Sequence, residues 1–161
     1  MLRYIALDAA SFLLVFSACT DIHARKIYNS ASLLIFVLSI FVSCARGDFL
    51  KEMIAVILLF PIFYTLWIFR IFGGGDVKLI LAVIPLVPLC DLVSLFLSIS
   101  IAGVFVALCC LIVSALSQRN SSFQASLQNI FVFRVKSSMS VPYGVAIAMG
   151  VLVETLKDQG M

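Results

Sequence analysis

The sequence GGGDVK at residues 73–78 separates two long apolar stretches, and it decides how the chain is organised. It places the carboxylate of Asp76 directly after three glycines in a protein whose mean hydropathy is +1.20. An ionisable residue beside lipid-soluble sequence is costly, so it indicates a functional site. Gly73 and Gly75 permit unusual backbone angles and the close approach of another segment.

The composition is that of a membrane protein. The chain has 161 residues, of which 63% are hydrophobic and 12% are charged, whereas soluble domains carry about 25% charged residues. We therefore expect one integral membrane domain over residues 1–161, in contact with the lipid bilayer. The net charge of +3 is small and its positive residues are scattered between apolar runs, which argues against a nucleic-acid partner.

The apolar stretches predict an all-α fold, a polytopic membrane bundle of six transmembrane helices. A spanning helix needs about 20 mostly apolar residues, and short loops favour antiparallel neighbours. The fourth stretch is short and contains Pro85 and Pro88, so we expect it to begin inside the glycine run or to be kinked. The predicted spans are residues 4–21, 30–45, 53–72, 77–90, 92–117 and 140–156.

Six spans divide the positive charges unequally. The side of the amino terminus receives four, which are Arg3, Arg46, Lys51 and Lys157. The other side receives seven, which are Arg25, Lys26, Arg70, Lys78, Arg119, Arg134 and Lys136. Because positive loops stay in the cytoplasm, the second side is predicted to be cytoplasmic and both termini to face away from it.

This topology brings two acids to one face. Asp21 ends the first span and Asp76 begins the fourth, so both are expected at the cytoplasmic face. Asp8 precedes Asp21 by about 20 Å of helix and Asp91 follows Asp76 at a similar offset, so both are expected at the opposite face. The remaining acids are predicted to be solvated loop charges, namely Asp48, Glu52, Glu154 and Asp158.

Two neighbouring carboxylates hold one proton between them, because both cannot ionise comfortably. Such a pair hydrolyses an amide: the ionised acid takes a proton from water and the protonated acid supplies one to the leaving nitrogen. Each acid taken alone is also compatible with a helix cap or a solvated loop residue. A phosphate-binding glycine loop is disfavoured, because no strand precedes the run and the Walker pattern is absent.

The five cysteines, with His23 as the single imidazole, form no C-x-x-C pair and predict no zinc site, no disulfide framework and no cofactor. An amino-terminal lipoprotein signal ending before Cys19 is disfavoured by Asp8 within its apolar stretch. In the long loop 117–140, apolar residues at helical spacing fit either an interfacial amphipathic helix beside the acids or a plain connecting loop on lipid.

Three short motifs carry a resemblance to a known family. Gly73 to Asp76 with Lys78 matches the G-x-G-D-x-K signature of the type IV prepilin peptidases, which are bacterial membrane aspartyl proteases of the GxGD type. Asp21 with Ile27 and Asn29 looks like the family's first motif. The third match resembles the family's Pro-Tyr-Gly at the start of the last span, and it consists of Pro142, Tyr143 and Gly144.

The resemblance implies that Asp21 and Asp76 are the catalytic pair and that the substrate is a prepilin, cut on the cytoplasmic side of its hydrophobic segment at the bacterial inner membrane. Residues that would bind substrate or support the pair are Gly73, Gly75, Lys78, Asn29, Pro142, Tyr143 and Gly144. Without the paired C-x-x-C motifs of the methylating members, the chain resembles the short peptidase-only form that serves Flp/Tad-type pili. Tyr28 departs from the family's usual proline.

Two other functional classes stay open at this stage. A proton-coupled transporter could use Asp21 and Asp76 as a relay, since intramembrane acids also mark transport paths, and it would be expected to show internal repeats and acids at mid-membrane depth. A structural assembly subunit would tolerate the loss of both acids. Neither the pilin nor the oligomeric state follows from the sequence.

Overall fold

The computed structural model describes residues 2–24, 27–119 and 142–160, and within them it contains helices and no strands. Two 3-10 turns, η1 (Ile84–Leu86) and η2 (Leu89–Asp91), follow the fourth helix. The described residues form six α-helices, which are α1 (Leu2–Ala24), α2 (Asn29–Arg46), α3 (Phe49–Ile68), α4 (Gly74–Val83), α5 (Leu92–Arg119) and α7 (Tyr143–Gly160). The predicted all-α helical bundle is confirmed.

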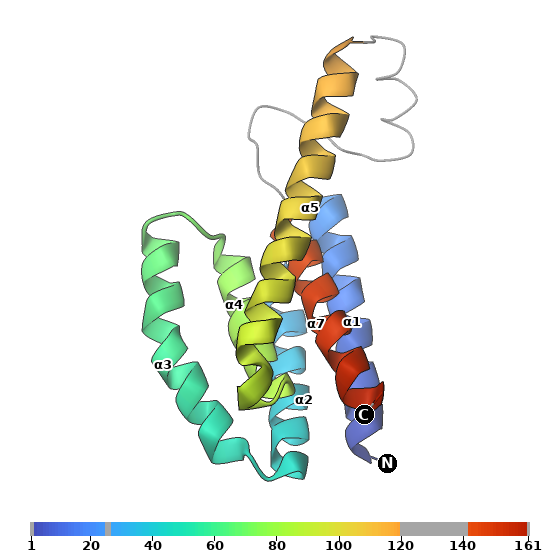
Figure 1. Ribbon diagram of the computed structural model, residues 1–161. Coiled ribbons are helices and arrows are strands. Elements are labelled where there is room, and N and C mark those ends of the chain that lie inside the picture. Colours follow the sequence, from blue (N-terminus) through green and yellow to red (C-terminus); the bar gives the residue numbers. More distant parts are fainter. Residues whose placement is uncertain (1, 25–26, 120–141, 161) are drawn as a thin grey trace.

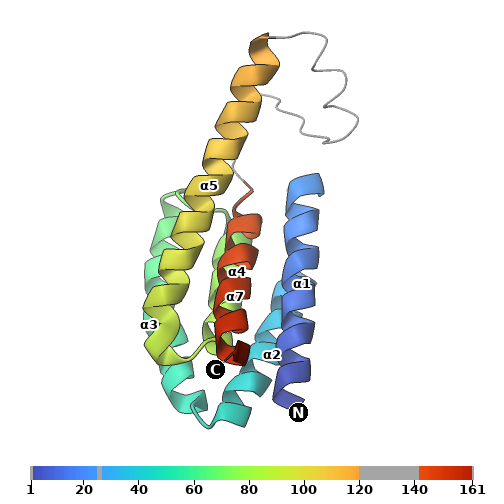
Figure 2. The ribbon, with the colours of Figure 1, turned by 45° about the vertical axis from the view of Figure 1, so that its right-hand side comes forward.

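The helices alternate in direction along the chain, so that the start of α1 and the end of α7 lie at the same end of the bundle (Figure 1). Helix α7 packs against both α1 and α5, and α2 packs against α1 and α4. Figure 2 shows α7 between α1 and α5, with the far part of α5 extending beyond the other helices. The carboxyl end of α1 and the amino ends of α4 and α7 therefore meet at the end opposite the termini.

Four segments of the described chain are long and apolar enough to cross a membrane: α1, α2, α3 and residues 89–113, which comprise η2 and most of α5. Helix α4 has ten residues, about 15 Å of rise, which is shorter than a hydrocarbon core of about 30 Å. It begins within the glycine run, as predicted, and gives way to the 3-10 turn η1, in which Pro85 lacks the N–H group that would continue the hydrogen bonds of an α-helix. The fourth predicted stretch, residues 77–90, is thus interrupted near its prolines, and its α-helical part ends at Val83.

The boundaries of two other spans also differ from the prediction. Helix α3 ends at Ile68, earlier than expected, because Arg70 adopts a left-handed backbone conformation with φ of 57° and the chain turns before the glycines. Helix α7 begins at Tyr143, directly after Pro142, which suits a helix start because its missing N–H is not needed there. Both shifts keep the glycine and proline motifs at the same end of the bundle.

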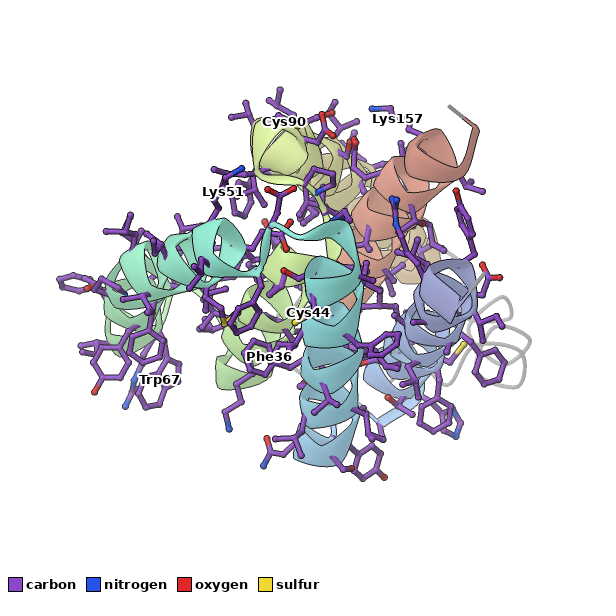
Figure 3. All side chains as sticks on the ribbon, turned by 90° about the horizontal axis from the view of Figure 1, so that it is seen from below. Phe36, Cys44, Lys51, Trp67, Cys90 and Lys157 are labelled. Carbon is purple, nitrogen blue, oxygen red and sulfur yellow. The ribbon has the colours of Figure 1, made fainter. Side chains whose placement is uncertain are left out.

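The core is built from the inner faces of the helices. Along α1, Leu7, Ala10 and Leu14 are completely buried and follow helical spacing, and the same cluster includes Ile35 of α2 and Leu79 of α4. Many large apolar side chains point outward instead, as seen along the bundle axis in Figure 3. An outward apolar surface on every side is the pattern of a bundle surrounded by lipid.

Two acids predicted to be solvated are buried, so that prediction was wrong for them. Glu52 is fully buried and forms a 2.8 Å ion pair with Arg46, whose guanidinium also donates to the carbonyl oxygens of Pro85 and Leu86. Glu154 is 5% exposed and bonded to polar groups of α5 and α7. A buried charge needs such partners, and sequence spacing did not reveal them. Asp48, by contrast, makes an exposed pair with Lys51.

Candidate active site

Asp21 lies near the carboxyl end of α1 and is only 8% exposed. It belongs to the helix face that carries Leu7, Ala10 and Leu14, one turn after another. Its Oδ2 accepts a hydrogen bond of 2.8 Å from the backbone N–H of Gly144, in the first turn of α7. The first and third sequence motifs, 123 residues apart, are thus joined by one buried bond.

Gly144 can donate this bond because it has no side chain. A Cβ atom at this position would lie 2.8 Å from Asp21 Oδ2 and 3.2 Å from its Cγ. The amino end of a helix has N–H groups without intrahelical acceptors and a partial positive charge. The start of α7 therefore presents a donor to the Asp21 carboxylate.

Asp76 lies in the first turn of α4, outside the four segments that can span a membrane. Its pKa is raised to about 6, chiefly by burial and also by the charge of Asp21, while a hydrogen bond from the Gly73 backbone acts in the opposite direction. Gly73 is the cap residue of α4 and a Cβ there would lie 2.8 Å from Asp76 Oδ2. The mutual effect of the two charges means that Asp21 and Asp76 are neighbours at the same end of the bundle.

The glycine run also contacts the segment that follows Asp21. A Cβ on Gly75 would lie 3.1 Å from the Cβ of Ile27, so this glycine permits a close approach of the α1–α2 connection. One helical turn after Gly75, Lys78 Nζ donates a hydrogen bond of 3.1 Å to Asn29 Oδ1 at the start of α2. These two contacts hold the start of α4, and with it Asp76, against the first motif.

Tyr143 supports the same arrangement from α7. Its ring meets Phe72, just before the glycines, edge to face with centroids 5.1 Å apart. Its hydroxyl lies over Gly103 of α5, where a Cβ would be 3.6 Å away. Sequence reasoning included Tyr143 but missed Phe72 and the indole of Trp67, which lies 3.0 Å from a Cβ placed on Gly74. The one available signal for these two residues was their position just before the glycine run.

Other predicted residues lie near the pair or outside it. Pro142 directly precedes α7 and is half-buried, and Tyr28, which departs from the family pattern, is exposed at the start of α2. Asp8 is exposed at the far end of α1. Of the long loop 117–140, residues 120–140 and the predicted amphipathic helix lie outside the described residues.

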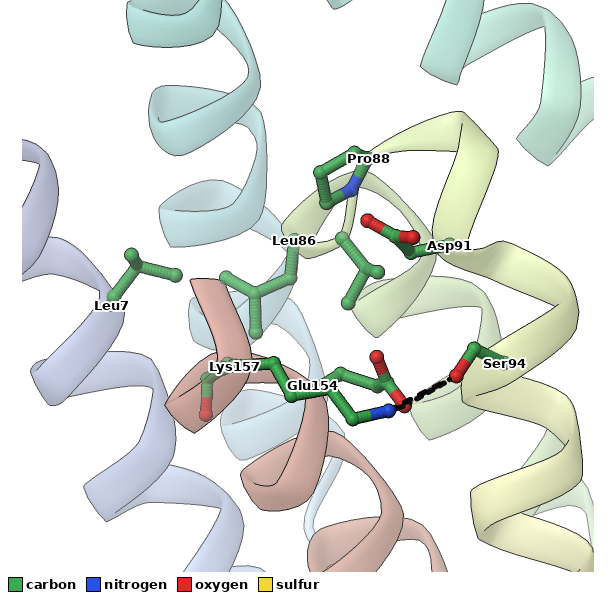
Figure 4. A pocket seen from close by; sticks show the side chains of 9 residues that line it. Leu7, Leu86, Pro88, Asp91, Ser94, Glu154 and Lys157 are labelled. Atoms are coloured by element: carbon green, nitrogen blue, oxygen red, sulfur yellow. Dashed lines mark hydrogen bonds and ion pairs between the residues drawn. The ribbon is translucent and has the colours of Figure 1, made fainter. Parts of the chain in front are cut away.

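Asp91 contributes to a cavity at the far end of the bundle, as predicted for its side of the membrane. This cavity of about 80 Å³ is lined in part by Asp91, Ser94, Glu154 and Lys157 (Figure 4). Glu154 Oε1 accepts hydrogen bonds from Ser94, Ser98 and Lys157, which link α5 to α7. Asp21 and Asp76 do not line the cavity, so these polar groups are separate from the neighbouring acids.

The site thus consists of two carboxylates in different surroundings. Asp21 is buried and accepts a backbone N–H, while Asp76 is half-buried with a raised pKa. Carboxylate pairs with unlike environments separate into a base and an acid. The arrangement can activate a water molecule and protonate a leaving group without a covalent intermediate.

Residues 9–110, well over half of the chain, match the family model described as the type IV leader peptidase family. The matched region includes both acids, the glycine run and the Asn29 contact, and it ends before the Pro-Tyr-Gly motif of α7. No curated protein and no solved structure matches the chain.

Proposed function

The chain belongs to the type IV leader peptidase family, and from that premise we propose that it is an aspartic endopeptidase that removes the leader of a Flp-type prepilin. The observation that carries the proposal is the meeting of Asp21 and Asp76 at one end of the bundle, where the charge of Asp21 adds to the effect of burial in raising the pKa of Asp76. The buried bond from Gly144 to Asp21 supports unequal roles for the two acids.

In the proposed reaction Asp21 is the general base and Asp76 the general acid. Asp21 takes a proton from a water molecule, and the water oxygen attacks the carbonyl carbon of the scissile peptide bond. The protonated Asp76 first supports the developing oxyanion and then gives its proton to the leaving nitrogen as the C–N bond breaks. The products are a free carboxyl group on the leader and a new amino terminus on the pilin.

The roles follow from the surroundings of each acid. A donor aimed at Asp21 favours its charged form, which is the form a base requires. Partial burial and the neighbouring negative charge favour a proton on Asp76, which is the form an acid requires. Contacts of α4 with α2 and α7 are proposed to hold the two acids in position. The residues proposed to make these contacts are Gly73, Gly75, Lys78, Asn29 and Tyr143.

We place this site at the cytoplasmic face of the bacterial inner membrane, on the basis of the charge distribution. At the dyad end the described residues carry Arg70 and Lys78, and loop residues beyond them add further positive charge. Single cysteines at Tyr28 and Asp48, in a variant that lacks the five native cysteines, test this orientation. Membrane-impermeant labelling from the cytoplasmic side should reach position 28 and not position 48.

The peptidase activity is tested with purified protein in detergent and a full-length Flp-type prepilin. The wild-type protein should release the leader at a single bond, identified by mass spectrometry of both products. Asp21→Asn and Asp76→Asn should each abolish cleavage while unfolding at the wild-type temperature. Asp8→Asn and Asp91→Asn are the matched controls and should retain activity, because both acids lie at the other end of the bundle. Cleavage that survives either dyad substitution would refute the proposal.

A further inference from the structure

A hydroxyl group without a hydrogen-bond partner lies in the core beside the catalytic pair. Ser17 of α1 is completely buried, and its Oγ has no partner among the described residues. Buried polar side chains are nearly always hydrogen-bonded, because an unpaired one loses its bonds to water without compensation. Alanine at this position would avoid that cost, so the hydroxyl calls for an explanation.

Ser17 lies one helical turn before Asp21. Residues four apart on a helix share a face and are direct neighbours, and the buried face of α1 runs through Leu7, Ala10, Leu14, Ser17 and Asp21. Every residue on this face before Ser17 is apolar. The first hydroxyl on the face therefore appears next to the catalytic carboxylate, within reach of one side-chain rotation.

Two other hydroxyls of the bundle have partners, whereas those of Ser32 and Ser43 in α2, like that of Ser17, have none among the described residues. Thr20 Oγ1 donates to the carbonyl oxygen of Ser17 at 2.9 Å, and Ser39 Oγ of α2 lies within hydrogen-bond distance of the Ala82 carbonyl oxygen in α4. Both use the backbone carbonyl groups that helical serines and threonines commonly select. The hydroxyl of Ser17 makes no such bond, so it is available for a side-chain acceptor.

We propose that Ser17 is a positioning residue that donates its hydroxyl hydrogen to the ionised carboxylate of Asp21 during the reaction. The proposal rests on the peptidase function proposed above. Because the two residues are four positions apart on one helix, we propose that a rotation about the Cα–Cβ bond of Ser17 forms this bond. With the Gly144 N–H on one side and the Ser17 hydroxyl on the other, Asp21 is held in one orientation and stays ionised as the base.

Charged and titratable groups at this end of the bundle define the pH dependence. They include Asp76 on α4, Tyr143 on α7, Lys78 bonded to Asn29 of α2, and His23 on α1 itself. Among them, Asp76 interacts electrostatically with Asp21. Removing a donor to the ionised base makes its protonation easier, so activity should be lost at a higher pH as the solution is acidified.

The experiment measures prepilin cleavage by purified protein across pH 4–9 for Ser17→Ala and Ser17→Cys. Alanine removes the hydroxyl, and cysteine keeps the volume but is a weak donor. We expect kcat near neutral pH to fall about tenfold in both variants and the acid limb to move up by about one pH unit, with KM unchanged. The matched control is Ser43→Ala, a fully buried serine of α2 at the other end of the bundle, which should leave the profile unchanged.

Three outcomes would overturn the proposal. A wild-type acid limb in Ser17→Ala would show that the hydroxyl does not act on Asp21. Full recovery in Ser17→Cys would assign Ser17 a space-filling role. An equal loss in Ser43→Ala would indicate a general effect of removing buried hydroxyls. If Asp21→Asn and Asp76→Asn also cleaved normally, the proposed function itself would fail, which separates the two failures.

Discussion

Gly144→Ala is expected to damage catalysis through one contact. The added Cβ would lie 2.8 Å from Asp21 Oδ2, whereas a carbon and an oxygen in contact lie about 3.3 Å apart or more. Asp21 or the start of α7 must therefore move by about half an ångström. The Gly144 N–H bond to Asp21, now 2.8 Å, would then exceed the usual limit of about 3.2 Å.

The lost bond is buried and its acceptor is charged. Such a bond is worth roughly 1.5–3 kcal/mol, and about 1.4 kcal/mol corresponds to a tenfold change in rate, so kcat/KM should fall roughly 10- to 150-fold. The assay is prepilin cleavage in detergent, with the thermal unfolding temperature measured on the same samples. The fold should persist, because the change affects a helix start where few groups must move.

Two glycines where α5 and α7 pack together serve as controls for Gly144→Ala. At Gly103 an added Cβ would meet Tyr143 at 3.6 Å, an ordinary contact, so Gly103→Ala should keep full activity and unfold no earlier than wild type. At Gly150 the Cβ would lie 2.8 Å from the backbone nitrogen of Ile99, so Gly150→Ala should mainly lower stability. Wild-type cleavage by Gly144→Ala would refute the reasoning.

Three further predictions concern the rest of the bundle. Gly75→Ala should reduce cleavage several-fold, because its Cβ would press on Ile27 at 3.1 Å, and Ile27→Ala in the same chain should restore part of the activity, as a double-mutant cycle would show. Because the pKa of Asp76 is about 6, kcat/KM should decline above that pH. The folded protein also binds this proton more tightly than the unfolded chain, so the free energy of unfolding should decrease as the pH rises from about 4 to about 6. Asp76→Asn should remove this pH dependence of stability. Glu52→Ala should lower the free energy of unfolding by about 3–5 kcal/mol, because Arg46 loses its buried partner. Thermal unfolding should show this loss of stability, and cleavage assays should show that the fraction that stays folded remains active.

The sequence was sufficient to predict the helical membrane bundle and the meeting of its motifs at one end. Apolar stretches of suitable length predicted the helices, and their alternation placed Asp21 and Asp76 at the same level. This reasoning works because the membrane restricts the fold to helices that cross in alternate directions. It needs only the order and length of the spans.

Contacts between helices could not be predicted in the same way. Nothing in the order of residues indicates that Gly144 donates to Asp21, that Tyr143 meets Phe72, or that Ser17 is buried without a partner. These contacts depend on the rotation and tilt of each helix, which are set by side-chain packing. The glycines were recognised as permissive positions, but their neighbours were not.

The acids at the far end show a second limit. Glu52 and Glu154 were expected in solvent because they lie near predicted span ends, yet both are buried with partners from other turns or helices. Hydropathy alone predicts that a charged residue near the end of a span lies in the aqueous phase. Its actual burial depends on whether a basic or hydroxyl group from elsewhere can pair with it.

The central claim is that Asp21 and Asp76 act as one unit, and a double-mutant comparison tests it most directly. Cleavage rates of Asp21→Asn, Asp76→Asn and the double variant are measured against one prepilin, on protein shown to be folded by thermal unfolding. Residues that act as a unit show strongly non-additive losses, so the double variant should be no slower than the slower single variant. Two partial losses that multiply in the double variant would contradict the account, because they would mean that the acids contribute independently.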